Sequence, residues 1–293
     1  PCSNHLTMIN SNYYYLVIKL RQVELPILAT LNKGKSLRIL HLSDLHLTPK
    51  QKNKISDLKE LSSLDPDLTI VTGDFLAHQD SVPAVIDALG GLLQKPGFFV
   101  FGSNDYYAPT IKNPISYLFS DSSGSRLGAK LPWLKLQSEL VKAGWLNLNQ
   151  RKLTTSINGI TIEARGTDDA HLKRDDYEAV SGKRNPDAQL SIGVTHAPYA
   201  RLLNAMHEDK LDLIIAGHTH GGQVRLPLPN FLGGSRALTT NCDLPTWRAR
   251  GLSKVGDQPW LHISAGIGTS PFAPFRLASP PEATLLTLSE ILN

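Results

Sequence analysis

Several classes of protein are excluded by what this chain of 293 residues lacks. Its two cysteines, Cys2 and Cys242, are too few for a disulfide framework and do not have the C-x-x-C spacing of a thiolate metal site. No stretch approaches the roughly 18 consecutive apolar residues that a membrane-spanning helix needs. A nucleotide-binding P-loop and the G-x-S-x-G motif are absent as well. The sequence thus offers no motif for a serine or cysteine nucleophile.

Domain boundaries are also missing, since neither an internal repeat nor a linker is evident. We therefore predict a single domain over residues 1–293, with a loose arm at 1–12, N-terminal edge strands at 13–30 and the core at 37–288. A leader or anchor before Pro1 would not be visible in this sequence. We expect a cytoplasmic location, with peripheral membrane contact as an open alternative.

The charge of the chain bears on its partners. The net charge of +4 suits an anionic substrate or an anionic membrane surface. Because the basic residues are spread out, nucleic acid is the less favoured partner. The sequence does not predict an oligomeric state.

Apolar segments alternate with helical segments along most of the chain. Strands are predicted at residues 13–20, 23–28, 37–42, 68–72, 97–101, 152–157, 160–164, 190–195, 211–216, 260–264 and 283–288, and helices at 52–63, 82–93, 133–143 and 199–206. The first two strands would form a hairpin or an edge pair, and Asn158-Gly159 predicts a type I′ turn. This alternation indicates a mainly parallel, layered α/β core.

Five of these strands end in residues that commonly bind metals. The sequences there are Asp44-Leu45-His46, Gly73-Asp74, Gly102-Ser103-Asn104-Asp105, Thr195-His196 and Gly217-His218-Thr219-His220. Because the carboxyl ends of parallel strands share one edge of a sheet, these side chains can converge. Carboxylates, imidazoles and amide or hydroxyl oxygens favour Mn, Fe, Zn or Co over metals that prefer thiolates. Seven candidate ligands suit two ions that share a carboxylate.

In this order the motifs resemble those of the calcineurin-like metallophosphoesterase superfamily, whose pattern is D-x-H, G-D, G-N-H-D, a later H and G-H-x-H. The resemblance spans about residues 37–265. The first, second and last motifs look most like the membrane-associated branch with UDP-2,3-diacylglucosamine pyrophosphohydrolase-like enzymes. Loops 102–109 and 264–275 resemble an actinobacterial offshoot of that branch. The resemblance implies a four-layered α/β/β/α sandwich of two mixed sheets with a binuclear metal centre.

The resemblance also implies a role for each motif residue. The residues that would hold two divalent ions (Mn, Fe or Zn) are Asp44, His46 and His220 for the first ion, His196 and His218 for the second, and Asp74 as the bridge between both. A hydroxide bridging the ions would then attack a phosphomonoester, phosphodiester or pyrophosphate without a protein nucleophile. The expected partner is a phosphorylated small molecule or lipid, with a lipid- or nucleotide-linked substrate preferred.

The third motif departs from the family's pattern, because it reads G-S-N-D instead of G-N-H-D. Aligned without gaps, Ser103 replaces the ligand Asn, and Asn104 replaces the His credited with protonating the leaving group. If the loop shifts by one residue, Asn104 still reaches the second ion. We favour that shift, because an amide oxygen is a better neutral ligand than a hydroxyl. In both alignments the usual acid is missing, which typically costs about 10²–10⁴-fold in rate unless another group replaces it.

Two histidines could replace that acid. We rank His78, four residues after Asp74, first, although it could equally be an ordinary helix N-terminal or surface histidine. His171 ranks second, in a loop that could also face solvent. Asp105 would orient its neighbours, and His41 would be a core histidine or one that supports a ligand.

The late loops could contact a substrate or a membrane. Residues that could touch the substrate are Asn241, Gly266, Gly268 and Arg276, and the apolar loop 271–275 could rest on a bilayer. Two other functions stay open: a non-catalytic metal-binding module, if the altered third motif has abolished turnover, and a nuclease of the same superfamily.

Overall fold

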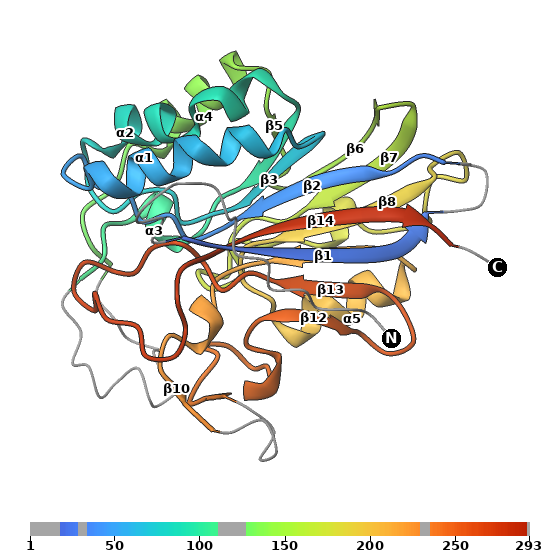
Figure 1. Ribbon diagram of the computed structural model, residues 1–293. Helices are drawn as coiled ribbons and strands as arrows, with labels where there is room; N and C mark the ends of the chain where they lie inside the picture. Colours follow the sequence, from blue (N-terminus) through green and yellow to red (C-terminus); the bar gives the residue numbers. More distant parts are fainter. Residues whose placement is uncertain (1–17, 29–33, 111–126, 229–234, 292–293) are drawn as a thin grey trace.

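Two six-stranded mixed sheets form the centre of the molecule (Figure 1). The computed structural model describes residues 18–28, 34–110, 127–228 and 235–291. The strands of the first sheet are, in spatial order, β1 (Lys19–Leu28), β14 (Glu282–Glu290), β2 (Leu37–Leu42), β3 (Leu68–Thr72), β4 (Gly97–Val100) and β5 (Leu146–Asn147). Those of the second are β12 (Gly251–Lys254), β13 (Trp260–Ile263), β9 (Leu213–Ala216), β8 (Leu190–Thr195), β7 (Ile160–Gly166) and β6 (Arg151–Ile157).

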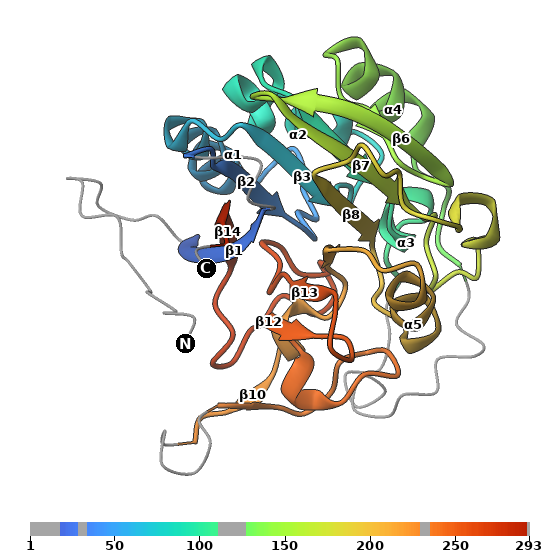
Figure 2. The same cartoon turned by 90° about the vertical axis from the view of Figure 1, so that its right-hand side faces the viewer.

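Helices cover the outer face of each sheet, which makes four layers (Figures 1 and 2). The helices α1 (Lys52–Glu60), α2 (Ser81–Leu89) and α4 (Trp133–Lys142) lie over the first sheet, and α5 (Ala200–Glu208) lies over the second. The alternation of strand side chains explains this stacking. In β2, Leu40 and Leu42 pack with the helices, while Ile39 packs between the sheets. The predicted four-layered sandwich of two mixed sheets is confirmed.

Most predicted elements are present with boundaries shifted by one or two residues. Helix α1 ends at Glu60 and α2 at Leu89, and each continues as a 3₁₀ turn, η2 (Leu61–Leu64) and η3 (Gly90–Gln94). Positive φ at both Asn158 (52°) and Gly159 (71°) fits the predicted type I′ turn between β6 and β7. The α-helix and strands that were not predicted are α3 (Ser103–Tyr106), β5, β10 (Arg225–Leu226), β11 (Arg236–Ala237) and β12. Three 3₁₀ turns were not predicted either: η5 (Glu178–Val180), η6 (His220–Gly222) and η8 (Thr246–Arg248).

The predicted N-terminal hairpin is wrong for the part of it that the structure describes. Strand β1 runs without a turn through residues 20–23 and pairs in parallel with β14. Its position at the edge of the sheet agrees with the prediction, while residues 13–17 lie outside the described part of the chain. Strand β1 continues through residues 20–23 because both faces of the sheet are apolar there: Leu20 packs into the core beneath the helices, and Val23 packs into the core between the sheets.

The parallel strands that carry the motifs end at one side of the sandwich. Strands β2, β3 and β4 are parallel neighbours in the first sheet, and β8 and β9 are parallel neighbours in the second. The loops after all five strands therefore meet at one edge. Within the described ranges, no helix is long and apolar enough to cross a membrane.

Candidate metal centre

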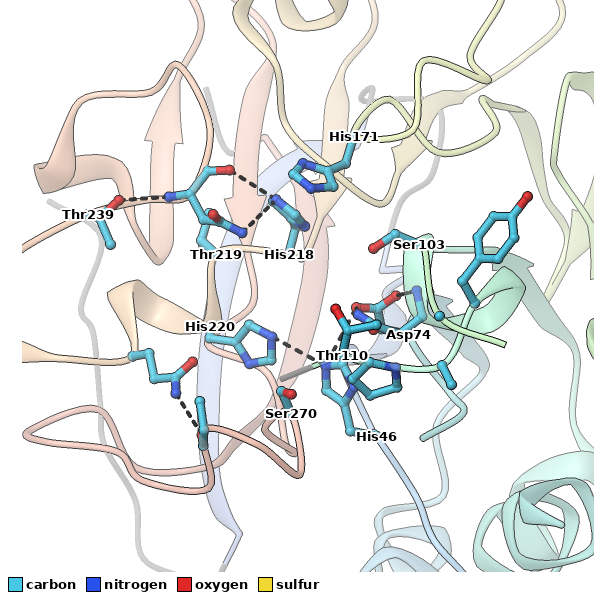
Figure 3. Close-up of a pocket in the computed structure, with 18 of the residues that line it drawn as sticks. His46, Asp74, Ser103, Thr110, His171, His218, Thr219, His220, Thr239 and Ser270 are labelled. Atoms are coloured by element: carbon cyan, nitrogen blue, oxygen red, sulfur yellow. Dashed lines mark hydrogen bonds and ion pairs between the residues drawn. The ribbon is translucent and has the colours of Figure 1, made fainter. Parts of the chain in front are cut away.

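One group of acidic and histidine side chains combines residues from both sheets. Asp44 and His46 follow β2, Asp74 follows β3, and His220 follows β9; their ligand-type atoms all lie within 4.8 Å of one another. His46 Nε2 lies 3.3 Å from His220 Nε2, and His220 Nε2 lies 3.5 Å from Asp44 Oδ1. Figure 3 shows His46, Asp74 and His220 directed towards the same space. Such a mixture of imidazole and carboxylate suits a divalent cation.

A second group shares Asp74 with the first. His218 Nδ1 lies 3.2 Å from His196 Nε2, which in turn lies 3.6 Å from Asp74 Oδ2. The same carboxylate oxygen lies 3.5 Å from His46 Nε2 of the first group. Asp74 Oδ2 is therefore the atom that both groups have in common. We call the seven residues around it the polar cluster: Asp44, His46, Asp74, Asn104, His196, His218 and His220.

Backbone carbonyls orient three of the four imidazoles in the polar cluster. His196 Nδ1 lies 2.6 Å from the Thr72 carbonyl oxygen, and His220 Nδ1 lies 3.1 Å from that of Gly268. His218 is turned the other way, with Nε2 3.1 Å from the Asn241 carbonyl oxygen. A carbonyl can only accept, so each of these nitrogens carries the proton and the other nitrogen keeps its lone pair. Each lone pair then faces the interior of the cluster, as a metal ligand requires.

Asp44 gives a direct test of whether a cation fits the cluster. Its Oδ2 accepts from Ser43 Oγ at 2.6 Å and from the His218 backbone N–H at 3.1 Å. Its Oδ1 is buried and accepts no hydrogen bond from any described residue. An ionised carboxylate oxygen buried in this way is costly unless a positive charge compensates it. The residues present therefore fit a bound cation beside Asp44 Oδ1.

The electrostatics of the imidazoles agree with this fit. Burial lowers the pKa of His46 to about 3 and holds the pKa of His218 well below its usual value. The pKa of His220 is lowered by the same cause. Burial also acts to lower the pKa of His196, but the carboxylates of Asp74, Asp44 and Asp169 outweigh it and raise that pKa to about 9. Burial thus keeps His46, His218 and His220 neutral, whereas the surrounding carboxylates favour a positive charge at His196. The same excess of carboxylate charge attracts a cation, which would take the place of the extra proton on His196.

The backbone of the cluster is strained in a way that is typical of functional sites. Positive φ angles occur at Asp44 (52°), His46 (42°), Asp74 (55°), His218 (69°) and His220 (50°). Residues with a side chain seldom adopt this left-handed region, and such strain persists only where the surroundings enforce it. Several interactions that enforce it come from Asp105, which follows β4.

Asp105 is completely buried and orients the Asp74 turn. Its carboxylate accepts from the backbone N–H groups of Asp74 (2.8 Å), Phe75 (2.8 Å), Leu76 (3.2 Å) and Gly102 (2.9 Å). A group that already accepts four backbone hydrogen bonds is suited to positioning and not to donating a proton to a substrate. This geometry agrees with the orienting role expected for Asp105.

Two glycines are needed because side chains approach their backbone closely. A Cβ atom on Gly102 would lie 2.4 Å from Asp74 Oδ1 and 2.7 Å from His196 Nε2. A Cβ on Gly217 would lie 1.8 Å from Ser43 Oγ, which holds Asp44. Glycine at these positions therefore allows the two sheets to bring their loops together.

The departure in the third motif places Asn104, and not Ser103, against the polar cluster. The Asn104 side-chain amide lies 2.7 Å from Asp74 Oδ2, and its backbone N–H donates to Asp74 Oδ1 at 2.7 Å. A 180° flip of the amide would present its oxygen to the cluster in place of its nitrogen. Ser103 lines the same cavity, but no hydrogen bond joins its side chain to a described residue.

The two histidines considered as proton donors lie in different surroundings, and the ranking from sequence is corrected. The His78 side chain is 56% exposed, lies beside Asp80 and is not among the described residues that line the cavity. His171 lines the cavity, with its ring centroid 4.8 Å from that of His218 (Figure 3). Its Nδ1 lies 3.1 Å from the Tyr199 hydroxyl. His78 follows Asp74 closely in sequence, but the chain turns away after β3.

The cavity above the polar cluster has a volume of about 330 Å³. Its polar part includes His46, Asp74, Asn104, His171, His218 and His220. Its apolar wall consists of Tyr107, Ala108, Pro109, Leu127, Leu172, Val224, Leu238, Ala273 and Phe275. The sequence did not indicate most of this wall, because it comes from short loop segments without a clear period. A substrate that fills the cavity would meet both charged and apolar groups.

The residues of the late loops that could touch a substrate have two different positions: one lines the cavity and another supports the loops around it. Asn241 lines the cavity, whereas Arg276 donates to the carbonyls of Ala265 (2.8 Å) and Gly268 (2.5 Å) and is not among the described lining residues. Its expected contact with substrate is thus replaced by a role in holding two loops together. His41 is a core histidine, 2.9 Å from both His262 Nδ1 and Thr72 Oγ1.

Comparison with known proteins adds independent findings. The family model of calcineurin-like phosphoesterases matches residues 37–222. The uncharacterized protein YpbG of Bacillus subtilis (strain 168) is 29% identical over 262 residues, which covers 87% of this chain and 83% of that protein. A transmembrane protein with metallophosphoesterase domain from Bos taurus is 27% identical over 276 residues, which covers 91% of this chain but only 56% of that protein.

A third relative has a named activity. The UDP-2,3-diacylglucosamine pyrophosphatase LpxG of Chlamydia trachomatis is 26% identical over 283 residues, which covers 85% of this chain and 83% of that protein. The membrane-associated branch predicted from the motifs thus appears among the relatives. The narrower actinobacterial offshoot stays a prediction.

Proposed function

This chain belongs to the calcineurin-like phosphoesterase family and is a metal-dependent phosphoric ester hydrolase, and on that premise we propose that it cleaves its substrate at a binuclear centre formed by the polar cluster. The observation that carries the proposal is the position of Asp74 Oδ2, 3.5 Å from His46 Nε2 and 3.6 Å from His196 Nε2. A carboxylate between two sets of imidazoles is the arrangement that two cations can share.

The polar cluster divides into two ligand sets. Asp44, His46 and His220 would hold the first cation, and the unpaired Asp44 Oδ1 supports this assignment. His196, His218 and the Asn104 amide oxygen would hold the second, with Asp74 common to both. We prefer Asn104 to Ser103 because its amide already lies 2.7 Å from Asp74 Oδ2.

The chemistry of two bound divalent cations would be to polarise the phosphoryl group and to ionise a water for attack on phosphorus. Asp74 and Asp105 keep the geometry of the site fixed: Asp74 supplies the shared carboxylate, and Asp105 holds the Asp74 backbone. The leaving-group oxygen must gain a proton as its bond to phosphorus breaks.

We assign the donation of that proton to His171. Among the histidines proposed for this role it is the one that lines the cavity, and Tyr199 can fix its ring through Nδ1. Its Nε2 is then the nitrogen that can transfer a proton to the leaving group. Tyr199 is a positioning residue in this scheme, because its hydroxyl acts through His171.

The substrate that we favour is a lipid- or nucleotide-linked phosphoester or pyrophosphate. The cavity supports this choice, since charged or imidazole groups and apolar side chains line it together. The activity in the name of the LpxG relative, on a diacylated nucleotide sugar, has the same combination of groups. The native metals would be Mn, Fe or Zn, according to the donor types.

A metal-reconstituted screen tests the proposal. Purified chain would be loaded with Mn, Fe or Zn, analysed for metal content and assayed against p-nitrophenyl phosphate, bis-p-nitrophenyl phosphate, a nucleoside diphosphate and a nucleotide–lipid diphosphate. We expect two ions per chain and hydrolysis that the His218→Ala variant lacks. Bound metal with turnover equal to that of His218→Ala would contradict the proposal and favour a non-catalytic metal-binding module. Salt-sensitive DNA cleavage would instead favour a nuclease.

A further inference from the structure

Three short segments form a small ribbon beside the cavity. Strands β10 and β11 pair in antiparallel orientation, and Leu238 N–H continues this pairing by donating to the Val224 carbonyl at 3.1 Å. On the other side of β10, Arg225 N–H donates to the Leu277 carbonyl at 3.0 Å. We call residues 223–226, 236–238 and 275–277 the ribbon. It lies apart from the two helical layers, at the lower end of the molecule in Figures 1 and 2, where β10 is labelled.

The inner face of the ribbon carries arginines. Arg225 is buried and donates from Nη1 to the Gly221 carbonyl at 2.8 Å and from Nε to Ser235 Oγ at 2.9 Å. Arg276 directs its guanidinium to backbone carbonyls, including those of Ala265 and Gly268. Both guanidiniums therefore point towards the protein and not towards solvent.

The outer face of the ribbon is apolar. Because side chains alternate along each strand, the residues flanking these arginines point the opposite way. The exposed fractions there are 48% for Leu226, 40% for Leu238, 49% for Phe275 and 52% for Leu277. Phe272, which is 46% exposed, lies in the same late loop. We call these five side chains the apolar face. A strand pair at a water-exposed surface normally has the reverse pattern, with charge outside and apolar groups inside.

The apolar face continues into the cavity. Leu238 and Phe275 belong to both, and Val224 extends the same surface inwards. An apolar surface that begins at the mouth of a site and continues outwards is typical of an interaction surface. Its partner must therefore meet the cavity mouth.

Charge on this part of the chain identifies the kind of partner. Residues 221–280 contain six basic residues and two acidic ones, namely Arg225, Arg236, Arg248, Arg250, Lys254 and Arg276 against Asp243 and Asp257. Their balance is +4, but Arg225 and Arg276 are turned inwards, so the positive charge that the ribbon presents to solvent is that of Arg236. Arg236 is exposed and pairs with Leu226 across the ribbon, so that it shares the apolar face. Apolar side chains bordered by positive charge match an anionic lipid surface.

We propose that the apolar face docks this chain onto an anionic lipid bilayer, with the cavity mouth turned towards the lipid. Leucine and phenylalanine side chains would enter the interfacial region, while Arg236 would meet the anionic headgroups. The benefit for catalysis rests on the proposed function: the phosphate of a lipid-linked substrate would reach the polar cluster while its acyl chains stay in the lipid.

Vesicle co-sedimentation of the whole chain tests this docking. The vesicles would contain phosphatidylglycerol and phosphatidylcholine, or phosphatidylcholine alone. The triple variant L226S/F272S/L277S changes only side chains of the apolar face that do not line the cavity. We expect it to lower the affinity for anionic vesicles by about tenfold or more, because three apolar side chains no longer enter the lipid. Neutral vesicles should bind the unaltered chain more weakly than anionic ones.

The control is the double variant L134S/V141S, which removes two exposed apolar side chains from α4, where they are 62% and 50% exposed. It should bind vesicles within twofold of the unaltered chain. Both variants should unfold at the temperature of the unaltered chain and hydrolyse p-nitrophenyl phosphate at its rate. These measurements separate lost docking from lost folding.

Three outcomes would overturn the docking proposal: no binding of the unaltered chain to anionic vesicles, equal binding by the triple variant, or equal losses in both variants. A dimer in sedimentation velocity that becomes a monomer in the triple variant would also overturn it, by assigning the apolar face to a second copy. Vesicle binding without hydrolysis of any phospho-compound would support the docking and contradict the proposed function, so the two can fail separately.

Discussion

The polar cluster and the ribbon both contribute side chains to one cavity and are built in opposite ways. The cluster collects charge in the interior, where imidazoles and carboxylates are buried and their free lone pairs face one another. The ribbon turns its arginines inwards to backbone carbonyls and exposes leucines and phenylalanines. Each arrangement is unfavourable without a partner: a cation for the cluster and an apolar surface for the ribbon.

This difference indicates that reaction and recognition are separate tasks in this molecule. In the proposed function the cluster would provide the groups that act on phosphate, and backbone contacts from both sheets fix these groups. The ribbon consists of loop segments outside the two large sheets and contains none of these groups. Changes to the exposed leucines and phenylalanines should therefore leave the cluster unaffected, whereas Arg276, which donates to the His220 carbonyl at 3.3 Å, links the two regions.

The largest effect should come from the shared carboxylate. Asp74→Asn keeps the shape of the side chain but removes the charge that two cations would share, so we expect kcat/KM to fall by roughly 10³-fold or more. Vesicle binding should not change, because the ribbon is intact. Elemental analysis, steady-state kinetics and co-sedimentation check these three points. Asp80→Asn, at an 81% exposed side chain, is the matched control and should have no effect. Full activity of Asp74→Asn would remove the basis of the binuclear assignment.

His171 should show the next largest effect. With an alkyl phosphate, His171→Gln should lower kcat by about 10²–10⁴-fold, since the alkoxide leaves slowly without a proton. With p-nitrophenyl phosphate the loss should be much smaller, because nitrophenolate is a good leaving group. His78→Gln should remain within twofold on both substrates. Equal losses of His171→Gln on both substrates would argue for a structural role and against proton donation.

A smaller effect is expected when the hydrogen bond that supports Asp44, a residue of the first ligand set, is removed. Ser43→Ala removes the 2.6 Å hydrogen bond to Asp44 Oδ2 without filling space. Loss of such a supporting contact typically weakens metal binding by about 10–100-fold. Titration of activity against Mn concentration should show this shift, with kcat largely recovered at saturating metal. A lowered kcat at saturation, with unchanged metal affinity, would contradict the supporting role.

The smallest effect should come from the pH dependence of stability that two buried histidines outside the polar cluster, His41 and His262, produce. Burial lowers the pKa of His262 to about 3 and holds the pKa of its neighbour His41 well below the usual value. In the unfolded chain both should titrate near 6.5. Their contribution to stability is therefore complete above about pH 6.5 and is lost as the pH falls towards 3.

Urea unfolding of the metal-free protein at several pH values checks this dependence of stability on pH. Each of the two histidines should lower the free energy of unfolding by about 1.4 kcal/mol per pH unit below 6.5. His262→Gln should reduce that slope by one such increment. An unchanged slope would show that His262 takes up its proton in the folded state.

The sequence predicted the polar cluster well for a physical reason. Its residues stand directly after buried strands, so a prediction of the strands also predicted the convergence of their ends. Asp44, His196 and His218 are examples, and Gly217 directly precedes His218.

The place of His171 in the cavity and the form of the ribbon could not be predicted in this way. His78 is close to Asp74 in sequence, yet His171 enters the cavity from a loop after β7 and is held there by a contact with Tyr199. The ribbon depends on pairing between residues near 225, 237 and 276, and each segment alone is too short to show a period. Such long-range pairing is decided by tertiary contacts and not by local pattern.

The Mn-loaded chain offers the most direct test of the central claim that Asp74 joins two cations. Elemental analysis and electron paramagnetic resonance should show two Mn ions per chain with the spectrum of an exchange-coupled pair. Asp74→Asn should lose the coupling. A single uncoupled Mn per chain, or coupling that persists in Asp74→Asn, would contradict the account.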